Sequence, residues 1–292
     1  MITPGLTPAG PADVARHYDE LDGFYRALWG EHLHHGLFEH RGEDPAVATE
    51  RLVDRVADLG EIGAGTEVCD VGCGYGATAR KLAVERGARV RGLTLSAAQV
   101  KVARARTPDT LPPGASLELL QGDWLRNDFP DGSFDTIVAI ECLTHMPDQA
   151  AFFAEATRTL RPGGRLVVCA WLTGDDPGRA ARRWLLEPIC REGELPGMGS
   201  VAETRELISR AGLELLAFQD WSGAVRRTWT VCARRVASAL ATDPAARRLL
   251  RDPAVRSRGF ARSVFRIWLA YRVGAMRYGL FVARRPVAGS GR

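Results

Sequence analysis

The sequence predicts an α/β protein built on a seven-stranded, mostly parallel sheet. From Thr66 onward, short apolar runs of strand length alternate with helical patterns, which is typical of a parallel sheet covered on both faces. A glycine-rich turn joins the first strand to the first helix after it, as in Rossmann-like folds that bind nucleotides. The 292 residues, 46% hydrophobic and 25% charged, suit one globular domain with an insertion.

An N-terminal helical lid is expected over residues 1–60. Apolar and aromatic residues recur at helical spacing between Ala12 and Trp29, and Pro45–Leu59 is amphipathic. The turn between these helices contains His32, His34 and His35. No acidic or cysteine partner stands at metal-ligand spacing, so we interpret this turn as lining a cofactor site rather than binding a metal.

The core of the fold is expected over residues 61–222. Its strands are predicted at 66–71, 89–93, 116–121, 134–140, 165–171 and 214–220. Its helices are predicted at 77–86, 97–106, 149–160 and 201–211. Ser96 caps the second of these helices, and Pro162-Gly163-Gly164 stops the third. Residues 173–199, rich in glycine, proline and charge, are expected to form a loop with a short helix.

A helical cap is expected over 223–272, inserted before the last strand, which lies within 273–292 together with the tail. Two Asp-Pro pairs, at Asp243 and Asp252, interrupt its helical pattern. Arginine pairs in the cap are interpreted as solvated helix faces.

Composition excludes several classes of protein. The net charge of +4 is modest and requires no nucleic-acid partner. The six cysteines are scattered without a CxxC pair, which argues against zinc. No apolar run reaches membrane-spanning length, and the N-terminus lacks the regions of a signal peptide. We therefore expect a cytoplasmic protein without stable membrane insertion, and leave a homodimer open.

The glycine turn has the pattern Gly72-x-Gly74-x-Gly76, directly after Asp70. A dinucleotide site favours GxGxxG and an acidic residue at the end of the second strand, where this chain has Thr94. Neither feature favours NAD. Asp123 and Trp124 follow the third strand, where an acid can accept a hydrogen bond from an adenine amino group and an aromatic ring can cover the base.

These motifs, with Ile140–Asp148 after the fourth strand, resemble the class I S-adenosylmethionine-dependent methyltransferases. Residues Trp29–Gly36, Gly92–Ser96 and Glu141-x-x-x-His145 are similar to the γ-tocopherol methyltransferase group, related to the cyclopropane fatty-acid synthases and to natural-product methyltransferases. The likeness extends from Val14 to Pro286. It implies a cofactor site formed by Tyr18, Trp29, His34, His35, Asp70, Gly72, Cys73, Gly74, Gly76, Thr94, Leu95, Gln99, Gly122, Asp123, Trp124 and Glu141.

For the reaction, we expect His145 to act as a general base, because imidazole titrates near neutral pH. If a helical turn follows the fourth strand, Glu141 and His145 lie four residues apart on one face. The alternatives are that His145 contacts the substrate or that it has only a structural role. Trp171, Trp184 and Trp229 are predicted near the substrate, whereas most other cap aromatics are expected to pack in the core. Arg226 and Arg227 could clamp a diphosphate.

The predicted function is transfer of a methyl group from S-adenosyl-L-methionine to an apolar small molecule in bacterial specialised metabolism. Carbon is the first choice for the acceptor atom, followed by oxygen or nitrogen. The alternatives are a cyclase that uses the same cofactor and a methyltransferase acting on a prenyl diphosphate. A macromolecular substrate is disfavoured, because the fourth strand is not followed by the Asn/Asp-Pro-Pro-aromatic motif of nucleic-acid amino-methylating enzymes.

Overall fold

The computed structural model describes residues 32–242, residue 244 and residues 257–287, with side chains in the last segment described from Ser263. The helix expected over 12–29, including Tyr18 and Trp29, lies outside these residues. Among the described helices, none combines the length and the apolarity that crossing a bilayer requires.

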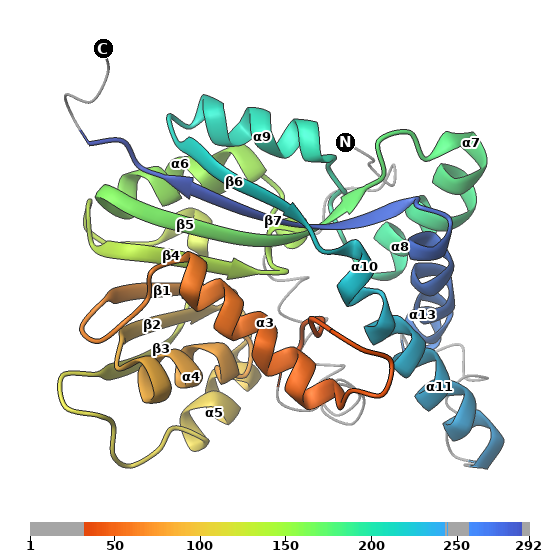
Figure 1. Cartoon of the computed structure of the whole chain (residues 1–292), viewed down its shortest axis with the longest axis horizontal. Helices are drawn as coiled ribbons and strands as arrows, with labels where there is room; N and C mark the ends of the chain where they lie inside the picture. Colours follow the sequence, from red (N-terminus) through yellow and green to blue (C-terminus); the bar gives the residue numbers. More distant parts are fainter. Residues whose placement is uncertain (1–31, 243, 245–256, 288–292) are drawn as a thin grey trace.

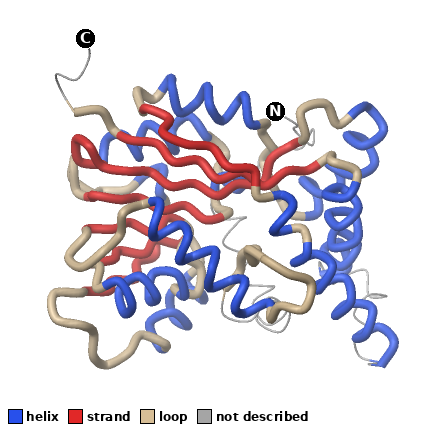
Figure 2. Tube along the Cα trace, in the orientation of Figure 1, coloured by secondary structure: helices blue, strands red, loops and turns tan. Residues whose placement is uncertain are grey.

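Seven strands form one sheet in the order β3-β2-β1-β4-β5-β7-β6 (Figures 1 and 2). The strands are β1 (Glu67–Val71), β2 (Arg89–Thr94), β3 (Ser116–Gln121), β4 (Phe134–Ile140), β5 (Leu160–Thr173), β6 (Glu214–Asp220) and β7 (Met276–Arg284). The first five run parallel to one another, and β7 runs antiparallel to both β5 and β6. The predicted mostly parallel sheet of seven strands is confirmed.

Helices cover both faces of the sheet (Figure 1). On one face α3 (Pro45–Leu59), α4 (Ala77–Arg86) and α5 (Ala97–Ala105) bury apolar residues such as Leu52, Leu82 and Ala103. On the other face α6 (Gln149–Thr159) and α9 (Val201–Arg210) bury Phe152 and Ile208. The central strands β1, β4 and β5 bury most of their residues because both of their faces are covered, whereas β3 at the edge is largely exposed or half-buried.

Local signals explain where these helices begin. Asp44, Ser96 and Asp148 accept hydrogen bonds from the first turns of α3, α5 and α6. Ser200 and Glu203 form a reciprocal capping box at the start of α9. Predicted helix ends agree with the observed ones to within a residue.

The segment after β5 is more helical than predicted. It contains α7 (Gly178–Ala181), the π-helical segment η3 (Arg182–Leu186) and α8 (Glu187–Glu192). Leu186, Ile189 and Cys190 are buried in the core, and their contacts with the cap stabilise a helix that the glycine and proline content did not indicate.

The described part of the cap consists of α10 (Ser222–Val225), α11 (Arg227–Thr242) and α13 (Ser257–Arg272). Figure 1 shows these helices beyond one end of the sheet, beside the segment that precedes α3. Three hydrogen bonds between described residues join the cap to that segment. The Phe38 amide donates to the Ala224 carbonyl at 3.3 Å, the Gly36 amide donates to Thr228 Oγ1 at 3.1 Å, and Trp229 Nε1 donates to His35 Nε2 at 2.5 Å.

Candidate functional site

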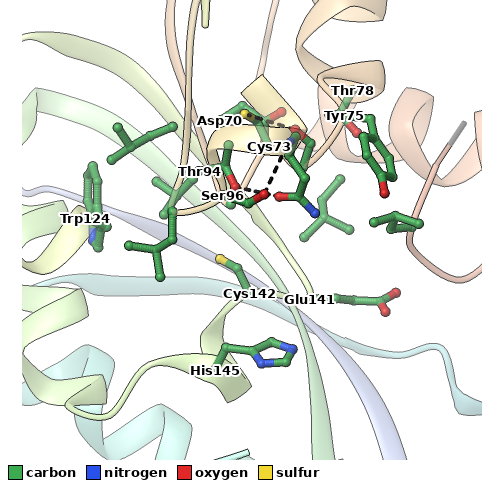
Figure 3. A pocket seen from close by; sticks show the side chains of 18 of the residues that line it. Asp70, Cys73, Tyr75, Thr78, Thr94, Ser96, Trp124, Glu141, Cys142 and His145 are labelled. Carbon is green, nitrogen blue, oxygen red and sulfur yellow. Dashed lines mark hydrogen bonds between the residues drawn. The ribbon is translucent and has the colours of Figure 1, made fainter. Parts of the chain in front are cut away.

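A pocket opens at the carboxyl ends of the parallel strands, where open α/β sheets bind ligands (Figure 3). The predicted site residues that line it are His34, Asp70, Gly72, Cys73, Gly74, Thr94, Leu95, Gln99, Gly122, Asp123, Trp124, Glu141 and His145. They come from the segment before α3 and from the ends of β1, β2, β3 and β4. Strand topology therefore brings together residues between Asp70 and His145, and the segment before α3 adds His34, more than a hundred positions from Glu141.

The glycine turn after β1 shapes one wall of this pocket. Gly72 has a φ of 76°, and a Cβ there would lie 2.5 Å from Cys142 Cβ, so only glycine fits. Gly74 also faces the pocket, and a Cβ there would lie 3.9 Å or more from Leu33 and Gln99, so a larger side chain would extend toward the cavity.

Gly76 does not line the pocket, contrary to the prediction from the motif. It is the N-cap of α4, with a φ of 70°, and a Cβ would lie 3.1 Å from Ala103 and 3.3 Å from Leu119. Its requirement for glycine therefore comes from this left-handed backbone and from close packing of α4 against α5 and β3.

Asp70 closes the base of the pocket at the end of β1. Its side chain is buried, and burial raises its pKa to about 7 although the Ala79 amide donates a hydrogen bond to it. The second carboxylate oxygen, Oδ2, is buried without a hydrogen-bond partner among the described residues. A buried carboxylate oxygen without a donor is unfavourable, so this position suits a cationic or hydrogen-bond-donating ligand.

A polar cluster at the end of β2 forms the next wall. Thr94 Oγ1 donates to the side-chain oxygen of Gln99, Oε1, at 2.7 Å, and the backbone N–H of Gln99 donates to Ser96 Oγ at 3.0 Å. Because the oxygen of the Gln99 side chain is engaged by Thr94, its nitrogen is left to donate on the side of the glycine turn.

Asp123 and Trp124 lie on the pocket wall after β3. Asp123 caps the 3₁₀ turn η1 (Trp124–Arg126) by accepting from the Leu125 amide at 3.0 Å. Trp124 is nearly fully buried, donates through Nε1 to the Phe152 carbonyl at 3.2 Å and packs on the Phe152 ring. The indole is thus held in place by α6 before any ligand binds.

Glu141 is the most heavily hydrogen-bonded carboxylate of the site. Its Oε1 accepts from the His35 amide at 2.7 Å, from His35 Nδ1 at 2.8 Å and from Tyr278 Oη at 2.9 Å. Its Oε2 accepts from Trp171 Nε1 at 2.9 Å. Burial acts to raise the pKa of Glu141, but the interaction with His35 and the hydrogen bonds it donates outweigh burial and lower that pKa, so the carboxylate is ionised at neutral pH.

The expectation that Glu141 and His145 share a helical face is wrong. Glu141 has a φ of 61°, in the left-handed region, and the 3₁₀ turn η2 covers only Leu143–His145. In Figure 3 the Glu141 side chain points away from His145, although both residues line the pocket. A strained backbone at a carboxylate with four donors is typical of a functional position.

His35 holds Glu141 rather than closing over the pocket, which it does not line. Its Nδ1 bonds to Glu141, and its Nε2 lies 2.5 Å from Trp229 Nε1. An indole N–H can only donate and a carboxylate can only accept, so this pattern places a proton on His35 Nδ1 and makes Nε2 the acceptor. The chain Trp229–His35–Glu141 thus links the cap to the pocket.

The three tryptophans predicted near the substrate have different positions. Trp171 and Trp229 belong to the Glu141 network, and Trp229 is fully buried. Neither lines the pocket. Trp184 is 66% exposed and lies under the Arg183 guanidinium. The sequence did not indicate that η3 turns the Trp184 side chain toward solvent.

His34 lines the pocket and is held in place by a second chain of hydrogen bonds. Its Nδ1 bonds to the His35 carbonyl at 2.9 Å and its Nε2 to His32 Nδ1 at 3.1 Å, while His32 Nε2 lies 3.1 Å from Glu50. Burial lowers the pKa of His34 to about 4. Within the described part of the chain, no group of three or more His, Cys, Asp or Glu side chains is arranged to hold a metal ion.

Sequence reasoning missed several contributors to this site. Tyr278, from β7, was not among the predicted site residues, yet its hydroxyl donates to Glu141. Tyr75, Thr78 and Ser96 line the pocket without having been singled out for it. Tyr75 lies within the glycine turn and Thr78 lies in the first turn of α4, so their closeness to the glycine motif in the sequence was an available signal. Nothing local indicated Tyr278.

Comparison with known proteins supports the family resemblance that the sequence motifs predict. Residues 9–246 match the family described as mycolic acid cyclopropane synthetase. The chain is 33% identical over 237 residues to 27-O-demethylrifamycin SV methyltransferase of Amycolatopsis mediterranei, covering 79% of this chain and 84% of that protein. It is 30% identical over 292 residues to the chloroplastic tocopherol O-methyltransferase of Arabidopsis thaliana, covering 94% and 82%. The crystal structure of the 4+2 cyclase SpnF superposes with a TM-score of 0.79 at 27% identity, covering 97% and 98% of the two chains.

Proposed function

The chain belongs to the mycolic acid cyclopropane synthetase family of S-adenosylmethionine-dependent methyltransferases, and we propose that its acceptor is an apolar small molecule of bacterial specialised metabolism. The predicted resemblance to the tocopherol methyltransferase group is confirmed. We propose carbon of an electron-rich ring or alkene as the methylated atom, then oxygen or nitrogen.

The charge of the pocket supports the cofactor on which this proposal depends. Its lining includes the carboxylates of Asp70, Asp123 and Glu141 and no lysine or arginine of the described residues. S-adenosylmethionine supplies a methyl group activated by a positively charged sulfur. A pocket lined by carboxylates and closed to cationic side chains favours such a cation over an anionic dinucleotide.

The residues present fit this cofactor. Asp70 offers a buried oxygen without a donor, and Gly72 and Gly74 let the backbone approach a ligand closely. Thr94 and Gln99 would hold the ribose side, and Asp123 and Trp124 the adenine side. Tyr18, Trp29 and His34 would complete the closure over it.

Glu141 and His145 would have different roles. Because four donors and a lowered pKa keep Glu141 ionised, it is a poor base and suits stabilisation of positive charge beside the reacting atoms. His145, which also lines the pocket, would accept a proton where the acceptor must lose one. Trp171 would help to orient Glu141 through the hydrogen bond from its Nε1 to Glu141 Oε2.

Mass spectrometry of reactions with candidate acceptors tests this function. We expect S-adenosylhomocysteine and a product heavier by one methylene to appear together. His145→Ala should retain cofactor affinity by calorimetry and lose turnover, and full activity of this variant would refute its role as base.

A cyclase that keeps its cofactor intact is the second candidate, favoured by the similarity to SpnF. Product formation without S-adenosylhomocysteine would support the cyclase and contradict methyl transfer. A prenyl diphosphate acceptor is the third, and its product would carry both the added methyl group and the diphosphate.

A further inference from the structure

A second cavity lies between the cap and the segment that precedes α3, on the side where Figure 1 shows that segment beside α10 and α11. Its walls come from three parts of the chain: residues 38–41, the start of α10 and α11, and the end of α13. It is lined by Phe38, Glu39, His40, Arg41, Gly223, Ala224, Arg226, Arg227, Thr230, Arg234, Trp268 and Arg272.

The charge of this cavity is opposite to that of the cofactor pocket. Five arginines and one glutamate line it, which leaves a charge of +4, equal to the net charge of the entire chain. The glutamate, Glu39, already lies 3.4 Å from Arg51. None of the five arginines forms an ion pair with a residue that the structure describes.

The helical register explains this clustering. Arg227, Thr230 and Arg234 recur at i, i+3 and i+7, so they share one face of α11. The neighbouring Thr228, Trp229 and Cys232 are buried on the other face. The arginine pairs were interpreted as solvated helix faces, but packing turns one such face toward a cavity.

Two of the guanidiniums are held by aromatic rings. Arg227 lies 5.4 Å from the Phe38 ring centroid, and Arg272 lies 4.3 Å from that of Trp268. The Nε of Arg227 is also buried and has no hydrogen-bond partner among the described residues. Like charges gathered in one cavity repel one another, and a ligand with several negative charges would offset this repulsion.

We propose that this cavity binds a phosphate-bearing small molecule, with diphosphate as the group that matches it best. Guanidinium forks bind phosphate oxygens through paired hydrogen bonds, and a diphosphate offers enough oxygens for several forks at once. The ligand would be either the phosphorylated end of the acceptor or a separate phosphate compound.

The walls of this cavity are continuous with the Glu141 network. On α11, Arg227 faces the cavity, while Thr228 accepts from Gly36 and Trp229 donates to His35. On the other wall, the Phe38 amide donates to Ala224. An anion that bridges the two walls would therefore stabilise the same contacts that hold Glu141 in place.

Calorimetric titration of the full chain with sodium pyrophosphate, without magnesium, tests the site. We expect one binding event per chain, weakened at least about tenfold in R226Q/R234Q, since each lost arginine removes a charge-assisted hydrogen bond. Both residues are exposed, and R55Q/R126Q removes the same charge from exposed arginines elsewhere. This control should bind as the parent chain does. Because neither methyl donor nor acceptor is present, the result is independent of the proposed reaction.

Hydrogen exchange of the same samples tests the link to Glu141. Pyrophosphate should slow exchange of the Gly36 and Phe38 amides at least severalfold in the parent chain and not in R226Q/R234Q. Competition of pyrophosphate with the acceptor in turnover would identify the acceptor as the phosphate source, whereas an unchanged acceptor KM would identify a separate ligand. Absence of pyrophosphate binding, or equal binding by R226Q/R234Q and R55Q/R126Q, would overturn the proposal.

Discussion

Replacing Asp70 by asparagine should remove a steep pH dependence from cofactor binding. In the free protein, burial raises the pKa of this carboxyl to about 7, so it loses its proton near neutral pH. A cationic cofactor favours the ionised form, which would bring the pKa in the complex back toward the usual value of 3.8. Cofactor affinity should therefore fall as the pH drops below 7.

The size of this effect follows from the fraction of Asp70 that is ionised in the free protein. With a pKa of about 7, that fraction is about 0.9 at pH 8 and about 0.01 at pH 5. If the ionised form is the one that binds, the dissociation constant rises roughly 90-fold over this range, or about 2.7 kcal/mol. Asp70→Asn should bind more weakly at pH 8 and lose this slope.

The same carboxyl should destabilise the free protein at high pH. Because its pKa is higher in the folded than in the unfolded chain, the folded state binds more protons between pH 3.8 and 7. This stabilising contribution is complete below pH 3.8 and is lost as the pH rises through 7. The loss is at most about 4 kcal/mol, so Asp70→Asn should raise the melting temperature of the free protein at pH 8.

Calorimetric titration with S-adenosylmethionine at pH 5, 6, 7 and 8, beside thermal unfolding without ligand, measures both effects. The asparagine variant is the control for other titrating groups, including His34. A dissociation constant of the parent chain that is flat across this range, or the same slope in Asp70→Asn, would refute the reasoning.

Three further substitutions test other parts of the site. Gly74→Val should abolish cofactor binding by calorimetry while the protein still unfolds cooperatively, whereas Gly63→Val, at a position with nothing within 4 Å of a Cβ, should bind normally. Unchanged affinity of Gly74→Val would contradict the assigned pocket. Glu141→Gln should turn an amide N–H toward groups that already donate. This should lower the free energy of unfolding by about 1–3 kcal/mol and turnover at least about tenfold. A variant as active as the parent would exclude an electrostatic role for Glu141. Trp229→Phe leaves His35 Nε2 buried without a donor and should cost about 2–4 kcal/mol in a thermal unfolding assay. Trp184→Phe, at a side chain 66% exposed, is the matched control, and equal melting temperatures of these two variants would contradict the Trp229–His35 bond.

Local patterns were sufficient for the framework of the fold. Strands β3, β4 and β6 begin and end where alternation and turn residues predicted. Their order along the chain, separated by helices, is itself enough to indicate a parallel sheet, because parallel strands need a crossover connection. The segment 173–199 was predicted less well, since its helices depend on contacts with the cap rather than on their own residues.

The pocket shows where local patterns stop being informative. Helical spacing placed Glu141 and His145 on one face, but a left-handed φ at Glu141 turns the carboxylate toward His35 instead. The motif placed Gly76 at the cofactor, but its neighbours in space are Ala103 and Leu119. In both cases contacts from distant parts of the chain decide which way a residue points.

By itself, the sequence determined the sheet, the glycine turn and the class of cofactor, because these depend on periodicity and on residues close together in the chain. Only the tertiary structure decided that Tyr278, Trp171 and Trp229 support Glu141 and His35, since these side chains meet across separations of 30 to 194 residues. The tertiary structure likewise separates charge into a carboxylate-lined pocket and an arginine-lined cavity. Net charge reports only the sum, whereas folding determines which charges share a cavity.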